Sequence, residues 1–141
     1  MITEEFLPIR VHVREQAEEF RRLGKRFGAE WTPTILMLGP EGEEHHRIEG
    51  FLPADDFLPQ LGLGLGRIHF HAGRFQEAED QFREVRERHP ESEAAAEARY
   101  WEGASRYKRT NDPSALAETA RAFQTKYTDT PWAKKASVWA G

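Results

Sequence analysis

The spacing of apolar residues changes once along this 141-residue chain, at Pro53. Before that proline the apolar residues alternate or form short runs, which is typical of strands, with one helical stretch among them. After it they recur three and four positions apart, which is the period of amphipathic helices. This change predicts an α+β part, residues 1–58, followed by an all-α part, residues 59–141.

The first part carries the signals of strands and one helix. Residues 6–13 alternate in polarity and predict a strand, and residues 15–27 have helical spacing. The continuous apolar run 35–38 is typical of a strand that is covered on both faces. A turn signal at 39–42 and renewed alternation over 45–51 then predict a hairpin. The expected order is strand–helix–strand–strand–helix.

The second part is predicted to be entirely helical. The expected helices, of which the first begins before the boundary of the two parts, cover about 54–72, 75–89, 91–109, 113–127 and 131–140. Asp112-Pro113 and Thr130-Pro131 each place a capping residue before a proline, a combination typical of a helix start.

Composition excludes several classes of function. The chain contains no cysteine, so disulfides, thiolate metal sites and thiol redox catalysis within this chain are excluded. The net charge is −4 with both signs interspersed, which argues against a nucleic-acid surface. No apolar run approaches the roughly 18 residues of a membrane helix, and no signal peptide is visible, so we expect a cytoplasmic protein. We expect no cofactor.

Three other patterns are weak candidates for a site. Residues 61–66, LGLGLG, lack the spacing and the preceding strand of a nucleotide-binding loop, and we expect these glycines to allow close helix packing. His45 and His46 are adjacent on a predicted strand and are expected to face opposite sides, so no metal site is predicted. Asp55 and Asp56 fit the first turn of a helix, where the helix dipole favours negative charge.

The helical part contains an internal repeat. A shift of 38 residues places Gly66 on Ala104 and Phe82 on Ala120. Such self-similarity predicts helix–turn–helix pairs that bury their apolar faces only by stacking on one another.

The first of these pairs resembles a tetratricopeptide repeat. The resemblance rests on residues at that family's spacing, which are Leu65-Gly66, Gly73, Phe75, Ala78, Phe82 and Pro90. It covers roughly residues 59–139, although Thr128 stands where the second pair would carry a proline. The resemblance implies a stack of helix pairs with a concave face that binds a partner.

Several residues of the predicted first helices would face the concave side if this register holds. They are Arg67, Phe70, His71, Trp101, Ser105, Lys108 and Arg109. Aromatic and arginine side chains are common energetic anchors of interfaces, and the basic residues suit a partner's carboxylates. The alternative is that Phe70 and Trp101 pack between helices, which we favour for Trp101.

Residues 6–61 resemble the second half of a thioredoxin fold. The predicted strand, the helix, the stretch WTPTILML, the hairpin and the following helix occur in that family's order. The resemblance implies that Thr32-Pro33 matches the cis-proline pair of the family's peptide-binding loop. The alternative is an ordinary trans peptide bond that only precedes a strand.

The chain also departs from the thioredoxin pattern. It lacks the Cys-x-x-Cys motif, and the family's first two strands would lie before residue 1. One missing strand would lie between those predicted at 6–13 and 34–38. The first strand could pair directly across this gap, a second copy could cover it, or the chain could be the tail of a longer protein. Because open strand edges favour association, we expect a homodimer.

These features together favour a non-catalytic protein–protein interaction or chaperone-like adaptor module that binds a protein or peptide. The alternative is the C-terminal fragment of a thiol–disulfide oxidoreductase whose Cys-x-x-Cys half is absent from this chain; an in-frame Cys-x-x-Cys in the upstream coding DNA would support it. A third hypothesis is a purely structural dimerisation unit.

Overall fold

The computed structural model describes residues 2–141, with side chains from Glu4 onward, and Met1 lies outside the described residues. The elements in chain order are α1 (Ile2–Glu5), α2 (Ala17–Phe27), β1 (Thr34–Leu38), β2 (Glu44–Glu49), α3 (Ala54–His71), α4 (Phe75–Arg88), α5 (Glu93–Thr110), α6 (Ser114–Phe123), α7 (Pro131–Ala136) and the 3-10 turn η1 (Ser137–Trp139). The predicted mixed architecture, with a hairpin near the N-terminus and helices after it, is confirmed.

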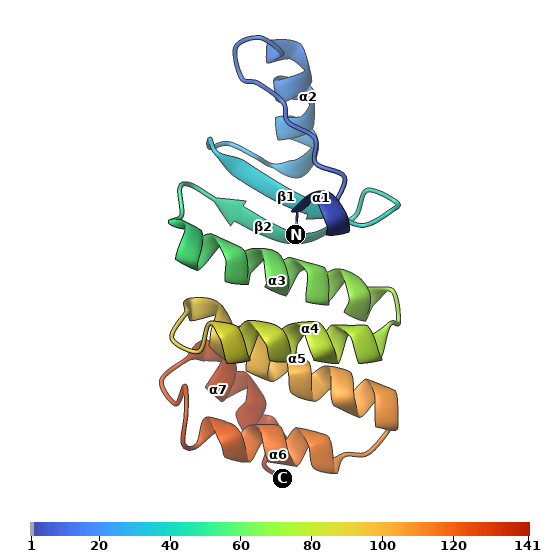
Figure 1. The fold of residues 1–141 in the computed structure, drawn as a ribbon, viewed down its shortest axis with the longest axis vertical. Coiled ribbons are helices and arrows are strands. Elements are labelled where there is room, and N and C mark those ends of the chain that lie inside the picture. Colours follow the sequence, from blue (N-terminus) through green and yellow to red (C-terminus); the bar gives the residue numbers. More distant parts are fainter. Residues whose placement is uncertain (1) are drawn as a thin grey trace.

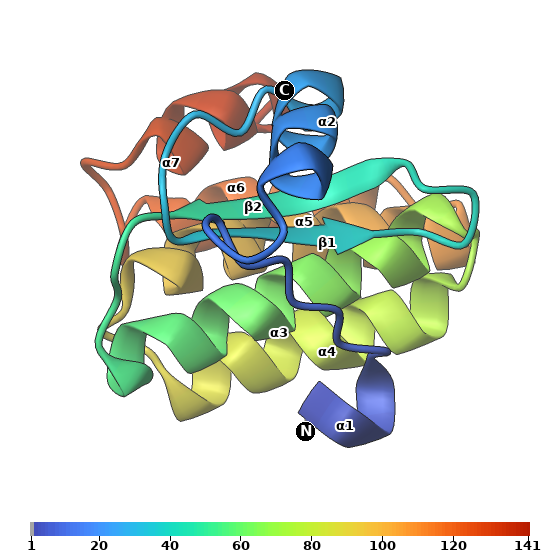
Figure 2. The ribbon, with the colours of Figure 1, turned by 90° about the horizontal axis from the view of Figure 1, so that it is seen from above.

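The elements form a stack of layers (Figure 1). Helix α2 lies on one side of the β1–β2 hairpin and α3 lies on the other, and the remaining helices follow beyond α3. Seen from above, the hairpin crosses over α3 (Figure 2). Helix α3 therefore belongs to both parts of the molecule, because it covers the hairpin with one face and packs on α4 with another.

Buried side chains form one cluster at each junction between layers. Met37 of the hairpin packs with Leu61 of α3, while Leu63 of α3 packs with Phe82 of α4 and with α5. Phe123 of α6 packs with α5 and α7 in a third cluster. Three separate buried clusters thus follow one another from the hairpin to the last helix.

The predicted strand at 6–13 is wrong. These residues pair with no strand of the described chain, whose sheet contains only β1 and β2. Phe6 packs against the hairpin cluster, but farther along the N–H of His12 donates to Gln16 Oε1 at 2.9 Å and the chain turns into α2. A strand requires a ladder partner, and local hydrogen bonds satisfy part of this segment instead.

The hairpin is antiparallel and contains a β-bulge. The ladder pairs Met37 with His46 and then Leu38 with Glu44, so that His45 is an extra residue of β2. Both histidines consequently contact α3. The prediction that they face opposite sides is wrong, because the bulge interrupts the alternation of the strand.

The glycines of residues 61–66 allow α3 to be approached from two sides. A Cβ atom built on Gly66 would lie 2.5 Å from Cε1 of Phe82, and one built on Gly64 would lie 2.1 Å from Sδ of Met37. The predicted close packing is confirmed, and it extends to the hairpin as well as to the next helix.

A second close approach joins α5 to α6. A Cβ atom built on Gly103 would lie 2.0 Å from Oγ1 of Thr119. Gly66 and Phe82 are 16 residues apart, and so are Gly103 and Thr119. The two close approaches therefore correspond with a shift of 37 residues, and the counterpart of Gly66 is Gly103 rather than the predicted Ala104, because this close approach requires a residue without a side chain.

The predicted helix bounds hold to within two residues except at the ends of α6 and α7. Helix α6 ends at Phe123 instead of 127, because Tyr127 adopts a left-handed conformation with φ of 63° and its hydroxyl donates to the carbonyl oxygen of Pro90 at 2.8 Å. The predicted last helix, 131–140, ends as a short α-helix followed by η1. The cap before it is confirmed, since Oγ1 of Thr130 accepts from the N–H of Ala133.

Candidate protein-binding surface

Large exposed apolar side chains are concentrated in the first part of the molecule. Among the described residues eight such side chains are exposed, and seven of them lie between residues 7 and 58. These seven, here called the N-terminal apolar residues, are Leu7, Ile9, Val13, Trp31, Leu38, Phe51 and Leu58. The eighth is Val138, near the C-terminus. Clustered exposed apolar surface marks interaction sites in folded proteins.

Helix α2 contributes further apolar surface. Phe20, Leu23 and Phe27 follow its helical spacing, yet α2 contains no buried residue. Arg47 of β2 holds the end of the helix by donating to the carbonyl oxygens of Phe27 and Gly28. Phe20, Leu23 and Phe27 are each only half buried, so the apolar side of α2 is half covered.

The loop before β1 has the geometry that the thioredoxin resemblance predicts. The peptide bond between Thr32 and Pro33 is cis, and the carbonyl oxygen of Pro33 accepts from the N–H of Gly50 at 2.8 Å. Thr32 and Pro33 are exposed, and so is Trp31, of which 68% is accessible. Sequence reasoning did not single out Trp31, although an aromatic residue between polar neighbours in a loop was the available signal.

The outer edge of β1 carries backbone groups that the hairpin does not use. Toward the β2 side, the carbonyl oxygen of Pro33 accepts from the N–H of Gly50, and the N–H of Gly39 donates to the carbonyl oxygen of Glu43, both at 2.8 Å. Alternation along the strand then turns the N–H and C=O of every second residue between them, such as Leu36, away from β2. No other element of the described chain bonds to these outward groups. An extended segment can therefore pair with this edge.

The structure brings together three of the predicted concave-face residues. Cζ of Arg67 lies 5.6 Å from the ring centre of Trp101, and the rings of Phe70 and Trp101 are 5.1 Å apart. Both aromatic residues pack against the cluster between α3 and α5. The alternative interpretation of Trp101, packing between helices, is the one that the structure confirms.

Three others lie outside the contact of Arg67 with Trp101, although the ring of His71 is 5.7 Å from that of Phe70. Ser105 is fully buried on the core side of α5, with its Oγ donating to a carbonyl oxygen of its own helix, so its predicted exposure is wrong. His71 is exposed, and its ring lies 4.8 Å from that of His45. The amine of Lys108 lies over the ring of Phe75 at 5.7 Å.

Two buried donors at the junction of α3 and α5 have no hydrogen-bond partner within the described chain. They are Nε of Arg67 and Nε1 of Trp101. The charge of Arg67 is balanced by Glu97, whose Oε1 lies 3.7 Å from Nη1. Leaving a buried donor unpaired costs about 1–3 kcal/mol, so this junction can donate further hydrogen bonds to a water or a ligand.

Arg109, the last predicted concave-face residue, belongs to a charged network that joins α4 to α5. The buried carboxylate of Glu79 accepts from Nε of Arg106 at 3.0 Å and from Nε of Arg109 at 2.9 Å. Burial by itself raises the pKa of Glu79, but the hydrogen bonds from Arg109 and Arg106 lower it below its ordinary value. Arg109 thus connects α5 to α4, and its pairing with Glu79 uses the charge that the prediction assigned to a partner.

The same network contains a second buried carboxylate, that of Glu102. Its oxygens accept from Nε of Arg86 at 2.8 Å and from Nη1 of Arg99 at 3.5 Å. Sequence reasoning missed both carboxylates. The available signal was an excess of arginine on two adjacent helices, each with an acid within the apolar stripe.

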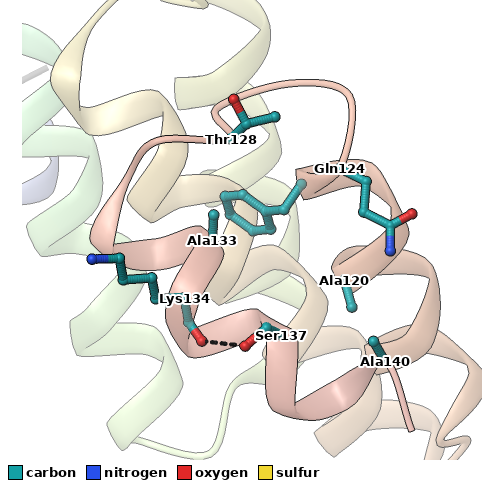
Figure 3. Close-up of a pocket in the computed structure, with 8 residues that line it drawn as sticks. Ala120, Gln124, Thr128, Ala133, Lys134, Ser137 and Ala140 are labelled. Carbon is teal, nitrogen blue, oxygen red and sulfur yellow. Dashed lines mark hydrogen bonds between the residues drawn. The ribbon is translucent and has the colours of Figure 1, made fainter.

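A hollow of about 490 Å³ lies between α6 and the segment α7–η1 (Figure 3). Its lining is mostly apolar and consists of Ala120, Phe123, Gln124, Thr128, Ala133, Lys134, Ser137 and Ala140. Within it, Oγ of Ser137 donates to the carbonyl oxygen of Lys134 at 2.7 Å. Lys134 is the one titratable residue of the lining, so the hollow lacks an acid–base pair.

Two searches of the described residues set limits on the kinds of site. Between residues 2 and 141 no three histidine or acidic side chains are placed to hold a metal ion. The helices of this described range are also too short or too polar to cross a bilayer.

Comparison with known proteins identifies the first part of the chain. Residues 1–64 match the family described as thioredoxin-like domain. The match ends within α3 and covers less than half of the 141 residues. No curated protein and no solved structure matches the chain. Residues 1–64 are therefore a thioredoxin-like part, to which α3 joins the remaining helices.

Proposed function

We propose that this chain is a non-catalytic protein-binding module of the thioredoxin and tetratricopeptide type, with a chaperone-like or adaptor role. The observation that carries the proposal is the concentration of exposed large apolar side chains between residues 7 and 58. Covering such side chains lowers the free energy of the system, because apolar surface is removed from water. Since the chain has no cysteine, its thioredoxin-like part acts by binding and not by thiol exchange.

The neighbourhood of the cis-proline loop suits an extended segment of another protein. The outward backbone groups of β1 offer main-chain hydrogen bonds, and Trp31, three residues before the start of β1, offers an exposed aromatic ring. Main-chain pairing supplies affinity without sequence preference, while side-chain contacts supply selectivity. The partner class that fits is an incompletely folded protein with exposed apolar residues.

The helical part serves in this proposal as a rigid tetratricopeptide-like scaffold. Two observations support the repeat: the close approaches of Gly66 to Phe82 and of Gly103 to Thr119 have equal spacing. The buried carboxylates of Glu79 and Glu102 add ion pairs across α4 and α5. Stacked pairs of this kind hold their neighbours in a fixed arrangement.

A client-aggregation assay tests the proposal. We expect the protein to suppress light scattering from a chemically denatured client enzyme diluted into buffer. Replacing Leu7 and Ile9 with serine is expected to abolish at least about half of the suppression, because these are the most exposed of the N-terminal apolar side chains besides Phe51.

Val138→Ser is the matched control, since Val138 is 77% exposed but lies outside the N-terminal part. Circular dichroism and thermal melts establish that all variants are folded. If the wild-type protein leaves aggregation unchanged, or if Val138→Ser has the same effect as the double variant, the proposed binding function is wrong.

A second candidate function is a structural dimerisation unit, which the open edge of β1 favours. In such a homodimer, a segment of a second copy covers this edge and the apolar side chains of residues 6–13. Light scattering on a sizing column measures the mass directly. A dimer that becomes monomeric in Ile9→Lys but not in Val138→Lys supports this candidate, and a monomer at all concentrations eliminates it.

A further inference from the structure

A small pocket on the helical part is lined by three cations and no acid. It measures about 260 Å³ and is lined by Arg86, Arg99, Ala122, Thr125, Lys126 and Tyr127. The two arginines come from α4 and α5, and the other four residues come from α6 and the turns after it. Positive charge gathered in a hollow of an overall acidic chain requires an explanation beyond solubility.

The cations of this pocket keep donors that the chain itself does not use. Nε and Nη2 of Arg86 donate to Glu102, and Nη1 forms no hydrogen bond in the described chain. Arg99 makes a single long contact through Nη1, at 3.5 Å. The amine of Lys126 forms no ion pair in the described chain and lies 5.1 Å from the ring centre of Tyr127.

The local charge remains positive after its neighbours are counted. The carboxylate of Glu102 lies behind the two arginines and is 2% exposed, so it holds their guanidinium groups in place from the core side. Glu87 lies 3.6 Å from Nη2 of Arg86, but 59% of its side chain is exposed, and water screens such a pair strongly. Three cations thus face one buried and one solvated carboxylate.

We propose that this pocket binds an oxyanion, the phosphoryl or carboxylate group of a small ligand or of a peptide end. Planar guanidinium groups pair with such oxygens through two parallel hydrogen bonds, and the ammonium of Lys126 adds a third contact. A water molecule occupies about 30 Å³ in the liquid. The pocket is several times larger, so it has room for the anionic group and for part of the molecule to which that group belongs. The site is distinct from the N-terminal apolar residues and does not depend on their function.

Two-dimensional NMR titration of the 15N-labelled full chain tests the proposal, with inorganic phosphate in one arm and acetate in the other, both at constant ionic strength. Saturable shifts of the amides of α6 and the turn after it are expected. Arg99→Gln and Lys126→Gln are each expected to weaken binding about tenfold or more, because each removes a charge-assisted contact.

Arg88→Gln is the matched control, since Arg88 lies on α4 outside the pocket and is 73% exposed. The Lys126 variant guards against misfolding, because that side chain is exposed. Saturation by phosphate alone assigns a phosphoryl ligand, saturation by acetate alone assigns a carboxylate ligand, and saturation by both supports an oxyanion site that accepts either group. Linear shifts with both ions, or equal weakening by Arg88→Gln, overturn the proposal.

Discussion

The two parts of this molecule bury their apolar residues to very different extents. Helix α5 places Ala94, Ala95, Ala96 and Ala98 in the core, whereas α2, with larger apolar side chains, buries none. The difference follows from what each helix packs against. Helix α5 lies among α3, α4 and α6, while α2 lies over a sheet of two strands and is anchored by one arginine. A two-stranded sheet offers little surface for a second covering helix.

Energetic consequences follow from this contrast. The helical part is held by buried apolar clusters and by ion pairs between α4 and α5, so we expect the helical part to unfold as one cooperative unit. Elements with few buried contacts open at lower free energy, and α2 with the segment before it fits that description. Single substitutions in each part measure this difference, and the largest effect is expected in the core of the helical part.

Leu63→Ala is expected to destabilise the protein most. Leu63 is fully buried between α3, α4 and α5, and truncating such a leucine removes transfer free energy and leaves a cavity. We expect the free energy of unfolding to fall by about 3 kcal/mol, measured by urea denaturation followed by circular dichroism. A loss below about 1 kcal/mol would show that the core of the helical part is loosely packed in solution and that the contrast with α2 is small.

Gly66→Ala tests the close contact between α3 and α4. The added methyl would meet the ring of Phe82, and such overpacking costs about 1–3 kcal/mol. Alanine gains up to about 1 kcal/mol of helix propensity, so the net loss in urea denaturation is expected to be about 1–2 kcal/mol.

Gly64→Ala is the control for this substitution, on the same helix and two residues away. Its methyl would meet the end of the flexible side chain of Met37, which can shift more easily than an aromatic ring, and would lie 3.1 Å from Cβ of His46. We expect a smaller loss than for Gly66→Ala. Equal losses in the two variants would mean that helix α3 is not wedged more tightly against α4 than against the hairpin.

Leu23→Ala repeats the leucine truncation in α2. Because Leu23 is only half buried and α2 has no buried residue, we expect a loss below about 1 kcal/mol, well under that of Leu63→Ala. The same urea denaturation measures it. A loss equal to that of Leu63→Ala would show that α2 is covered in solution, for example by a second copy of the chain. Light scattering on a sizing column would then show whether the protein is a dimer.

Local patterns predicted most elements, and nonlocal contacts account for the misses. The spacing of Phe75, Ala78 and Phe82 is sufficient for α4, since an amphipathic helix is specified by its own residues. Residues 6–13 have an equally clear alternation, but a strand exists only with a partner, and partners are not encoded locally. The bulge at His45 is missed for the same reason, because it depends on how β1 and β2 are aligned.

The same distinction between local patterns and nonlocal contacts applies to the candidate sites. The cis bond before Pro33 was predicted from a resemblance that spans several elements in order. Arg109 was placed on a binding face, whereas it pairs with Glu79 across two helices. That pairing depends on the helix crossing, and no spacing along one helix reveals it. Exposed residues such as Trp31 escape sequence analysis because exposure is a property of the whole fold.

The smallest expected effect is a pH dependence of the hairpin–α3 junction. Burial lowers the pKa of His46 below its ordinary value, although the hydrogen bond to Gln60 opposes this. Below about pH 6.5 the unfolded chain therefore binds a proton that the folded chain does not, and stability falls as the pH falls. We expect urea denaturation to show lower stability at pH 5.5 than at pH 7.5, and a smaller decrease in His46→Gln.

The decrease that remains in His46→Gln is expected from His69, whose pKa burial also lowers. The pKa of Glu79 is lowered as well, so Glu79 contributes to the pH dependence only at more acidic pH. An identical decrease in wild-type protein and His46→Gln would show that His46 stays accessible to protons and that the junction opens in solution.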